Sequence, residues 1–309
     1  MRFFFLFLVS LTSVVAISGC GKKELYSNRQ FLMGTVVEVI SPHPEASEIV
    51  FDELRRIESI FSVYKQDSLI SKLNNLGFIE YNQEITDLLK KSLEFYKFTD
   101  GRFDVTVGPL TKLWKEAINQ RKIPSQKLIE ERKRLVGMQK VLFTADKIEL
   151  KETGMSLDFG AIAKGYAVDK AVEKLKEKKI DSAIINAGGD IYCLGSKFGQ
   201  PWNVGIQHPR DKKRIIKVLK LKNKAVATSG DYEQFMEINN QRYSHIIDPQ
   251  TGYPVKNDVI SVTIIADSCM IADAVATSIF LLGKEIGEEK FKNMKGIEEI
   301  IVLTKHDLL

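Results

Sequence analysis

The segment Leu157–Tyr166, with the sequence LDFGAIAKGY, constrains the fold of this chain more than any other. Asp158 stands at the end of a short apolar run, small residues and Lys164 follow, and a helical pattern then begins. This order predicts a strand over 156–158, a tight turn and a long helix over 161–178. Small residues let a ligand approach the backbone, and the first N–H groups of a helix attract anions. Read alone, the segment fits a phosphate- and metal-handling turn as well as it fits a helix packed tightly on a sheet.

The other apolar patterns predict strands that neighbour strands as often as helices. This arrangement is typical of an α+β protein with mostly antiparallel sheets packed against helices. No repeat or Pro- or Ser-rich linker divides the chain, and we expect one domain over 20–309. Strands are predicted over 28–40, 102–107 (ended by Gly108-Pro109), 141–150 (with a possible turn at 146–147), 183–186, 202–206, 215–221, 225–228, 242–247, 259–265 and 300–303. Helices are predicted over 46–61, 69–74, 85–99, 110–121 and 270–282, with 122–138 as an insertion or a peripheral helix.

The net charge of +5 is small for 309 residues, and Lys and Glu are mixed along the predicted helices. This mixing is typical of a solvated surface and does not favour nucleic-acid binding. Apart from Cys20, the cysteines are Cys193 and Cys269, both in apolar surroundings. We expect buried free thiols, with a single disulfide as the alternative. No CxxC motif or Cys/His cluster indicates zinc.

Residues 1–19 have the pattern of a secretory signal peptide, because Arg2 precedes a mostly apolar run over 3–15 and small residues lead to Cys20. The run is short for a membrane-spanning helix. A Cys directly after Ser-Gly resembles the bacterial lipobox, in which that Cys carries acyl chains, palmitate among them, and becomes the first residue of the mature protein. We therefore expect a lipid-anchored extracytoplasmic protein and favour the periplasmic side of the inner membrane over the outer membrane, with a plain signal peptide as the alternative.

A nearly apolar helical pattern over 270–282 contains a single charged residue, Asp273. A lone carboxylate in a buried helix is costly unless it is paired, hydrogen-bonded or bound to a metal. Thr277 follows four residues later and shares its face. A carboxylate, a hydroxyl and backbone carbonyls form a hard oxygen set that suits Mg²⁺. The pattern predicts a magnesium site, with an Asp satisfied by hydrogen bonds as the alternative.

Three further stretches fit both ligand binding and plain structure. The loops Asn186–Asp190 and Thr228–Asp231 follow predicted strands, and their small residues permit close approach to the backbone. His245 lies between a predicted strand and the turn Asp248–Gly252, a place where functional groups are often found. The ordinary pKa of His suits a general base at neutral pH, and a structural His is the alternative.

Eight segments recur in a fixed order over nearly all of the chain after Cys20. They are MGT at 33–35, SVY at 62–64, GRFDVTVGPL at 101–110, LDFGAIAKGY at 157–166, NAGGD at 186–190, TSG at 228–230, SHIIDPQTGYP at 244–254 and ADAVAT at 272–277. Together they resemble the ApbE-type flavin transferases, a family of FAD:protein FMN transferases with many bacterial lipoproteins. Each segment alone is weak evidence, whereas eight in order are specific.

The resemblance implies a fold, a reaction and a set of site residues. The residues expected to line the FAD site are Met33, Tyr64, Arg102, Phe103, Asp104, Asp158, Lys164 and, through its backbone, Ile247. Tyr64 is expected near the flavin ring. Mg²⁺ is expected at Asp273, Thr277 and the carbonyls of Ala161 and Ala276, and His245 is the expected catalytic base. The glycines of Leu157–Tyr166 would then give room for FAD. The implied reaction splits the FAD pyrophosphate, releases AMP and joins FMN by a phosphoester to a Thr or Ser of an acceptor protein.

Two positions depart from the family pattern. Lys164 stands where some relatives carry Glu, and Ala276 where some carry a second Asp, which implies weaker or more carbonyl-dependent Mg²⁺ binding. With water in place of the acceptor the products are FMN and AMP, so a FAD hydrolase stays an alternative. A lipid-anchored flavin-binding protein without turnover is another, although storage needs no metal at a pyrophosphate. The acceptor protein, the choice of membrane and the oligomeric state are left open.

Overall fold

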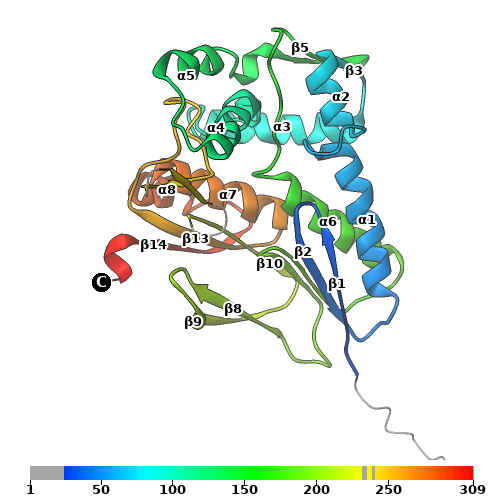
Figure 1. Cartoon of the computed structure of the whole chain (residues 1–309). Coiled ribbons are helices and arrows are strands. Elements are labelled where there is room, and N and C mark those ends of the chain that lie inside the picture. Colours follow the sequence, from blue (N-terminus) through cyan, green and yellow to red (C-terminus); the bar gives the residue numbers. More distant parts are fainter. Residues whose placement is uncertain (1–23, 232–234, 239–240, 309) are drawn as a thin grey trace, which may run out of the picture.

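One antiparallel sheet of seven strands organises the computed structural model, which describes residues 24–231, 235–238 and 241–308 (Figure 1). The strands lie in the order β1-β2-β6-β7-β10-β13-β14, and each neighbouring pair is antiparallel. Their bounds are β1 Tyr26–Leu32, β2 Thr35–Ser41, β6 Ala183–Ala187, β7 Asp190–Leu194, β10 Lys224–Gly230, β13 Val259–Ala266 and β14 Ile297–Thr304. The α+β class expected from the sequence is confirmed.

Two layers cover the two faces of this sheet. Helices α1 (Ala46–Phe61), α6 (Ala163–Glu177) and α7 (Cys269–Leu282) pack on one face. The hairpin of β8 (Trp202–His208) and β9 (Asp211–Leu221) buries its own apolar cluster against the other. All eight residues of β13 are buried, because its apolar run VISVTIIA lies between both layers.

A helical cap over residues 62–155 stands above the helical layer in Figure 1. It holds α2 (Leu69–Leu76), α3 (Gln83–Phe98), α4 (Gly108–Gln120), α5 (Gln126–Lys133) and a small sheet of β3 (Phe78–Glu80), β5 (Lys147–Leu150) and β4 (Val141–Phe143). The remaining elements are α8 (Lys284–Phe291), the hairpin β11 (Phe235–Ile238) and β12 (Gln241–Ser244), and 3₁₀ turns at Val105–Val107, Met138–Lys140 and Lys305–Leu308.

The single strand predicted over 28–40 is wrong, because this stretch is a hairpin. Met33 and Gly34 form the two-residue turn between β1 and β2, with φ of 52° and 73°. Two residues with positive φ suit the twist of a tight hairpin. An alternating pattern cannot distinguish one long strand from two short ones, so only the Met-Gly pair marked the reversal.

Two short strands predicted near the site are also wrong. Residues 102–107 form a bend and the 3₁₀ turn Val105–Val107, and Pro109 lies in the first turn of α4 instead of breaking a strand. Residues 156–158 are extended without a strand partner. The side chain of Asn74 takes that place, since it accepts from the amide of Leu157 (2.7 Å) and donates to its carbonyl (2.9 Å).

Other differences concern bounds. The predicted strand 242–247 ends at Ser244, and 141–150 divides into β4 and β5 around a turn near residue 145. The stretch 122–138 contains the peripheral helix α5, whose Ile129 is fully buried beside Trp114 and Ile247. This apolar anchor gives the charged stretch a definite place on the molecule.

Cys193 and Cys269 are free and buried, as expected, and burial raises the pKa of the Cys193 thiol to about 12. Among the described residues, no helix is both long and apolar enough to span a membrane. The expected signal peptide and Cys20 lie outside the described residues.

Candidate active site

The β1–β2 and β6–β7 turns lie at the same end of the main sheet, which we call the turn end, and several predicted site residues are found there. The β1–β2 turn carries Met33, and the β6–β7 turn carries Gly188 next to Asp190. These turns touch, since the Gly188 amide donates to the Val36 carbonyl (3.3 Å) and a Cβ on Gly188 would lie 2.2 Å from the Thr35 hydroxyl. Gly188 has φ of +60°, and only glycine, which has no Cβ, lets the two turns lie this close.

Helices α6 and α7 approach each other closely at this end. A Cβ on Gly165 would lie 2.4 Å from the Cys269 carbonyl oxygen, so a side chain there would force the helices apart. The Gly165 amide donates to Asp273 Oδ2 (3.1 Å). Gly165 thus serves helix packing and holds the carboxylate, whereas the sequence resemblance had suggested room for FAD.

Asp169 fixes the start of α7 from the neighbouring helix α6. Its carboxylate accepts from the Ser268 hydroxyl (2.6 Å) and from the amides of Cys269 (2.8 Å) and Met270 (3.0 Å). A carboxylate at the first amides of a helix satisfies donors that lack partners inside the helix. This contact sets the position of Asp273 one turn further along α7.

A second carboxylate lies beside Asp273. Asp190 is also buried, and its Oδ2 lies 3.3 Å from the Lys164 ammonium. Burial and then the charge of Asp190 raise the pKa of Asp273 well above its usual range, and the Lys164 ammonium opposes this. Burial likewise raises the pKa of Asp190, although Lys164 lowers it. Two buried carboxyls so close hold a proton between them or need a further cation.

The local oxygen atoms fit Mg²⁺. Asp190 Oδ2 is buried without a hydrogen bond of proper geometry, despite its ion pair with Lys164. The Gly165 amide donates to Asp273 instead of to the carbonyl of Ala161, four residues earlier. In the described chain, no backbone amide donates a hydrogen bond to the Ala161 carbonyl. Thr277 Oγ1 lies 3.1 Å from the Ser229 hydroxyl. These are hard oxygen ligands, although no group of three or more His, Cys, Asp or Glu side chains forms a metal cluster in the described residues.

Ala276 is completely buried on α7 next to Thr277, so its methyl group contributes packing. The weaker, more carbonyl-dependent Mg²⁺ binding expected from the absence of a second Asp at this position stays a prediction.

Glu58 on α1 links two segments expected to line FAD. Its carboxylate accepts from the Met33 amide (2.9 Å) and lies 2.6 Å from the Lys65 ammonium. The first contact holds Met33 in its positive-φ conformation, and the second holds the loop that carries Tyr64. The Tyr64 side chain is 73% exposed, with Lys115 Nζ 4.6 Å from its ring centroid. Such an exposed ring is available to stack on a planar ligand.

The three residues of the segment 102–104 have different surroundings. Arg102 donates to Asp248 Oδ2 (2.7 Å) and so ties the cap to the loop after His245. Phe103 is buried, with its ring 5.3 Å from that of Phe95. Asp104 caps the 3₁₀ turn by accepting from the Thr106 amide and hydroxyl, and burial raises its pKa to about 6. The Phe103 ring therefore belongs to the core and not to a surface that a ligand can reach.

Asp158 is half buried beside this segment. Its amide donates to the Val105 carbonyl (2.7 Å), and its carboxylate accepts from the Gly160 amide (3.0 Å). The structure thus brings Asp158 next to Asp104, although the two are far apart in the sequence.

The segment with His245 is held from the cap. Ile247 is buried and bridges to Pro254, and the Trp114 indole donates to the Gly252 carbonyl (2.8 Å). His245 is half buried directly before this clamped turn. The cap thereby fixes the backbone on which the expected base stands.

Sequence reasoning missed Glu58, Asn74, Asp169 and Trp114 as residues that support the site. Each acts through a partner that is distant in the chain, and none has a local motif. Asp190 was part of the recognised loop Asn186–Asp190, but only the structure shows that its carboxylate is buried beside Asp273.

Comparison with known proteins decides the family. The ApbE family model matches residues 33–301. The chain belongs to the ApbE family. The FAD:protein FMN transferase of Treponema pallidum is 32% identical over 94% of this chain and 88% of its own length. That of Klebsiella pneumoniae is 30% identical over 93% and 92%. The family predicted from the eight segments is confirmed.

Solved structures of ApbE proteins share the fold. The ApbE protein of Thermotoga maritima superposes with a TM-score of 0.83 at 35% identity, covering 92% of this chain and 95% of that one. Flavin transferase ApbE from Vibrio cholerae gives 0.77 at 26% identity, covering 92% and 98%.

Proposed function

We propose that this chain is an enzyme, a Mg²⁺-dependent FAD:protein FMN transferase. The observation that carries the proposal is the buried pair Asp190 and Asp273, with Lys164, where α6 and α7 meet. Such a pair is suited to a divalent cation and, through it, to a pyrophosphate. Family membership and the names of the curated relatives support flavin transfer from FAD.

Asp273, Thr277 and the carbonyls of Ala161 and Ala276 would hold Mg²⁺. When bound, the ion would neutralise charge on the pyrophosphate. Lys164 would add a second positive charge there, held in place by its ion pair with Asp190. Because Lys164 is 23% exposed, its ammonium stays within reach of a ligand that enters from solvent.

FAD would be positioned mainly from the turn end and the cap. Tyr64 would stack on the flavin ring, while Met33, Arg102 and Asp158 would contribute polar and backbone contacts. Ile247 would act through its backbone, and Asp104 through the turn it caps. Phe103 would fix its neighbours from the core, because its ring is buried and its amide already donates to the Thr99 hydroxyl.

The chemical step forms one P–O bond and breaks another. The hydroxyl of an acceptor Thr or Ser attacks the phosphorus on the FMN side, and the bond to the bridging oxygen breaks. His245 takes the hydroxyl proton, and AMP leaves with the bridging oxygen. If water replaces the hydroxyl, the same residues give free FMN and AMP.

The test is incubation of the chain with FAD, Mg²⁺ and an acceptor peptide that contains a Thr, read by mass spectrometry. We expect a covalent FMN adduct and AMP, both abolished by EDTA. Free FMN without adduct would identify a hydrolase, and AMP release unaffected by EDTA would remove Mg²⁺ from the mechanism. His245→Ala should lose transfer while FAD binding is retained; transfer at the parental rate would refute the assignment of the base.

Lipid attachment at Cys20 and an extracytoplasmic location are further parts of the proposal. They rest on the sequence of residues 1–20. Intact-mass analysis of the membrane fraction should find acyl chains on Cys20, and Cys20→Ser should release the protein. Membrane association that persists without acylation would contradict the anchor.

A further inference from the structure

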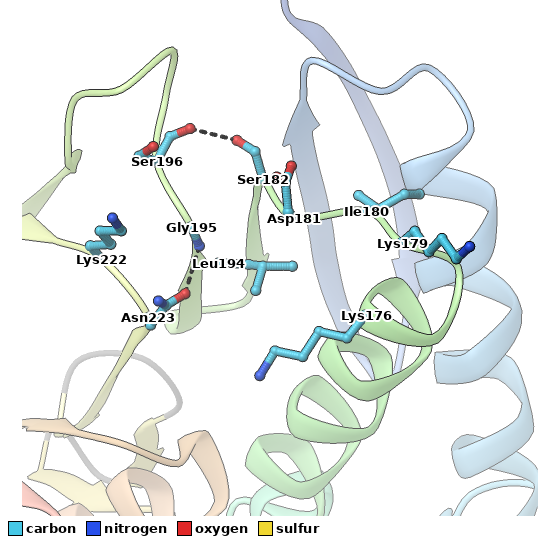
Figure 2. A pocket seen from close by; sticks show the side chains of 10 residues that line it. All are labelled: Lys176, Lys179, Ile180, Asp181, Ser182, Leu194, Gly195, Ser196, Lys222 and Asn223. Carbon is cyan, nitrogen blue, oxygen red and sulfur yellow. Dashed lines mark hydrogen bonds between the residues drawn. The ribbon is translucent and has the colours of Figure 1, made fainter.

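A basic cavity lies at the sheet end opposite the candidate active site, which we call the entry end. It has a volume of about 450 Å³, and its lining includes Lys176 and Lys179 from the end of α6 and Lys222 before β10 (Figure 2). Asp181 is the one acidic residue among the described residues that line it, and it lies 3.5 Å from His43. The cavity is large enough for a phosphate-bearing head group.

The three lysines of the cavity lining share two properties. All three are exposed, and none has a carboxylate partner among the described residues, whereas neighbouring Lys174 and Lys224 pair with Glu177 and Asp267. Figure 2 shows Lys176 extending from α6 toward the side where Lys222 lies, whereas the Lys179 side chain points the other way. Lys176 Nζ also lies 6.0 Å from the centroid of the Tyr192 ring. Exposed ammonium groups without carboxylate partners suit anionic ligands.

The floor of the cavity is built by specific backbone contacts. Gly195 has φ of +56°, and a Cβ there would lie 1.8 Å from the Asp181 carbonyl oxygen. The Gly195 amide donates to Asn223 Oδ1 (2.8 Å), and the Ser182 hydroxyl donates to the Ser196 carbonyl (2.8 Å) (Figure 2). The hollow is therefore held open by fixed strand ends and is not a gap between mobile side chains.

The chain enters the fold at this same end. Tyr26 begins β1 and pairs with Ser41, whose hydroxyl donates to the carbonyl of Ser182 in the cavity wall. Cys20 precedes Glu24 by four residues, and so short a link spans at most about 14 Å. A membrane anchor at Cys20 would therefore hold the entry end, and the cavity with it, against the lipid surface.

We propose that this cavity binds the phosphate of anionic phospholipids and sets the orientation of the anchored protein on the membrane. Lys176 and Lys222 would contact the head group. The candidate active site would then face away from the lipid surface, toward solvent and an acceptor protein. This inference rests on the proposed lipid anchor at Cys20 but not on the flavin chemistry, because it uses none of the residues proposed for that chemistry.

The test uses the full chain with vesicles of phosphatidylcholine, with or without phosphatidylglycerol. An amine-reactive reagent and mass spectrometry report how fast each lysine is modified. We expect anionic lipid to slow modification of Lys176 and Lys222 about fivefold, the effect of one lysine at an anionic surface. The exposed Lys72 and Lys112 of the cap should not change. High salt should remove the protection.

Three results would overturn the proposal. They are equal protection with both kinds of vesicle, protection by inorganic phosphate without vesicles, and protection of the cap lysines to the same degree. Lys222→Gln should weaken the protection of Lys176 by anionic vesicles, whereas Lys72→Gln should not. Because Lys222 is exposed, its substitution leaves the fold intact, and an unchanged Lys176 would also count against the proposal.

Discussion

The turn end and the entry end of the main sheet use charge in opposite ways. At the turn end, Asp190 of β7 and Asp273 of α7 are buried side by side, and the Lys164 ammonium lies 3.3 Å from Asp190 Oδ2. At the entry end, Lys176 and Lys222 are exposed around an open hollow. A buried charge interacts strongly with the charge of a nearby ligand, because little water lies between them. The interaction of an exposed charge with a ligand is weakened by water and salt. Substitutions at the turn end should therefore have much larger effects than those at the entry end.

The largest effect is expected from Asp273→Asn. Loss of the carboxylate removes the principal Mg²⁺ ligand, so FMN transfer should fall at least about a hundredfold. The same change removes carboxylate repulsion, so the metal-free protein should unfold at higher urea concentration. The assay pairs adduct formation with urea unfolding, and Asp267→Asn at an exposed site is the control. Full activity in Asp273→Asn would show that the buried pair has no catalytic part.

Gly165→Ala tests the close approach of α6 and α7. Its Cβ would meet the Cys269 carbonyl at 2.4 Å, and overpacking of this kind costs about 3 kcal/mol of unfolding free energy. Gly160→Ala is the matched control, since that residue is exposed and would meet only the Asp158 side chain. Equal unfolding midpoints for the two variants would mean that the helices can move apart freely.

Asp104 makes stability depend on pH. Burial raises its folded pKa from 3.8 to about 6, so the folded state keeps a proton that the unfolded chain releases. The stabilisation from this proton is complete below pH 4 and is lost as pH rises through about 6. The free energy of unfolding should fall by about 2 to 3 kcal/mol over this range. Asp104→Asn should remove this slope in urea unfolding at several pH values, while the exposed Asp258→Asn should not. An unchanged slope would contradict the raised pKa.

Glu58→Ala should weaken FAD binding about tenfold, because two FAD-lining segments lose their shared anchor. Flavin fluorescence titration measures the affinity. Glu58→Gln keeps an acceptor for the Met33 amide and should lose less. Glu48→Ala, on the exposed face of the same helix, should bind FAD as the parent does, and a similar loss there would point to a general effect on α1.

The smallest effect is expected at the entry end. Lys222→Gln should change FMN transfer to a soluble peptide less than about twofold, because an exposed charge far from the site is screened. A large loss of FMN transfer in Lys222→Gln would contradict the expected difference between the turn end and the entry end.

Much of the fold was readable from local patterns. The apolar runs of β13 and α7 predicted buried elements, and both lie between layers. The predictions of secondary structure were wrong where one sequence pattern fits two different structures. The alternation over 28–40 fits a hairpin as well as a strand, and the extended 156–158 is paired by an Asn74 side chain instead of a neighbouring strand.

The sequence by itself determined the family, the α+β class and the unusual carboxylate of Asp273 in an apolar helix, because motifs and periodicity are properties of neighbouring residues. Only the tertiary structure decided that Asp190 faces Asp273, that Asp169 fixes the start of α7 and that Glu58 joins Met33 to Lys65. It also placed three exposed lysines without carboxylate partners in the lining of one cavity, at the sheet end where the chain enters the fold. These contacts join residues from distant segments, and a local pattern carries no information about which distant segment will pack against it.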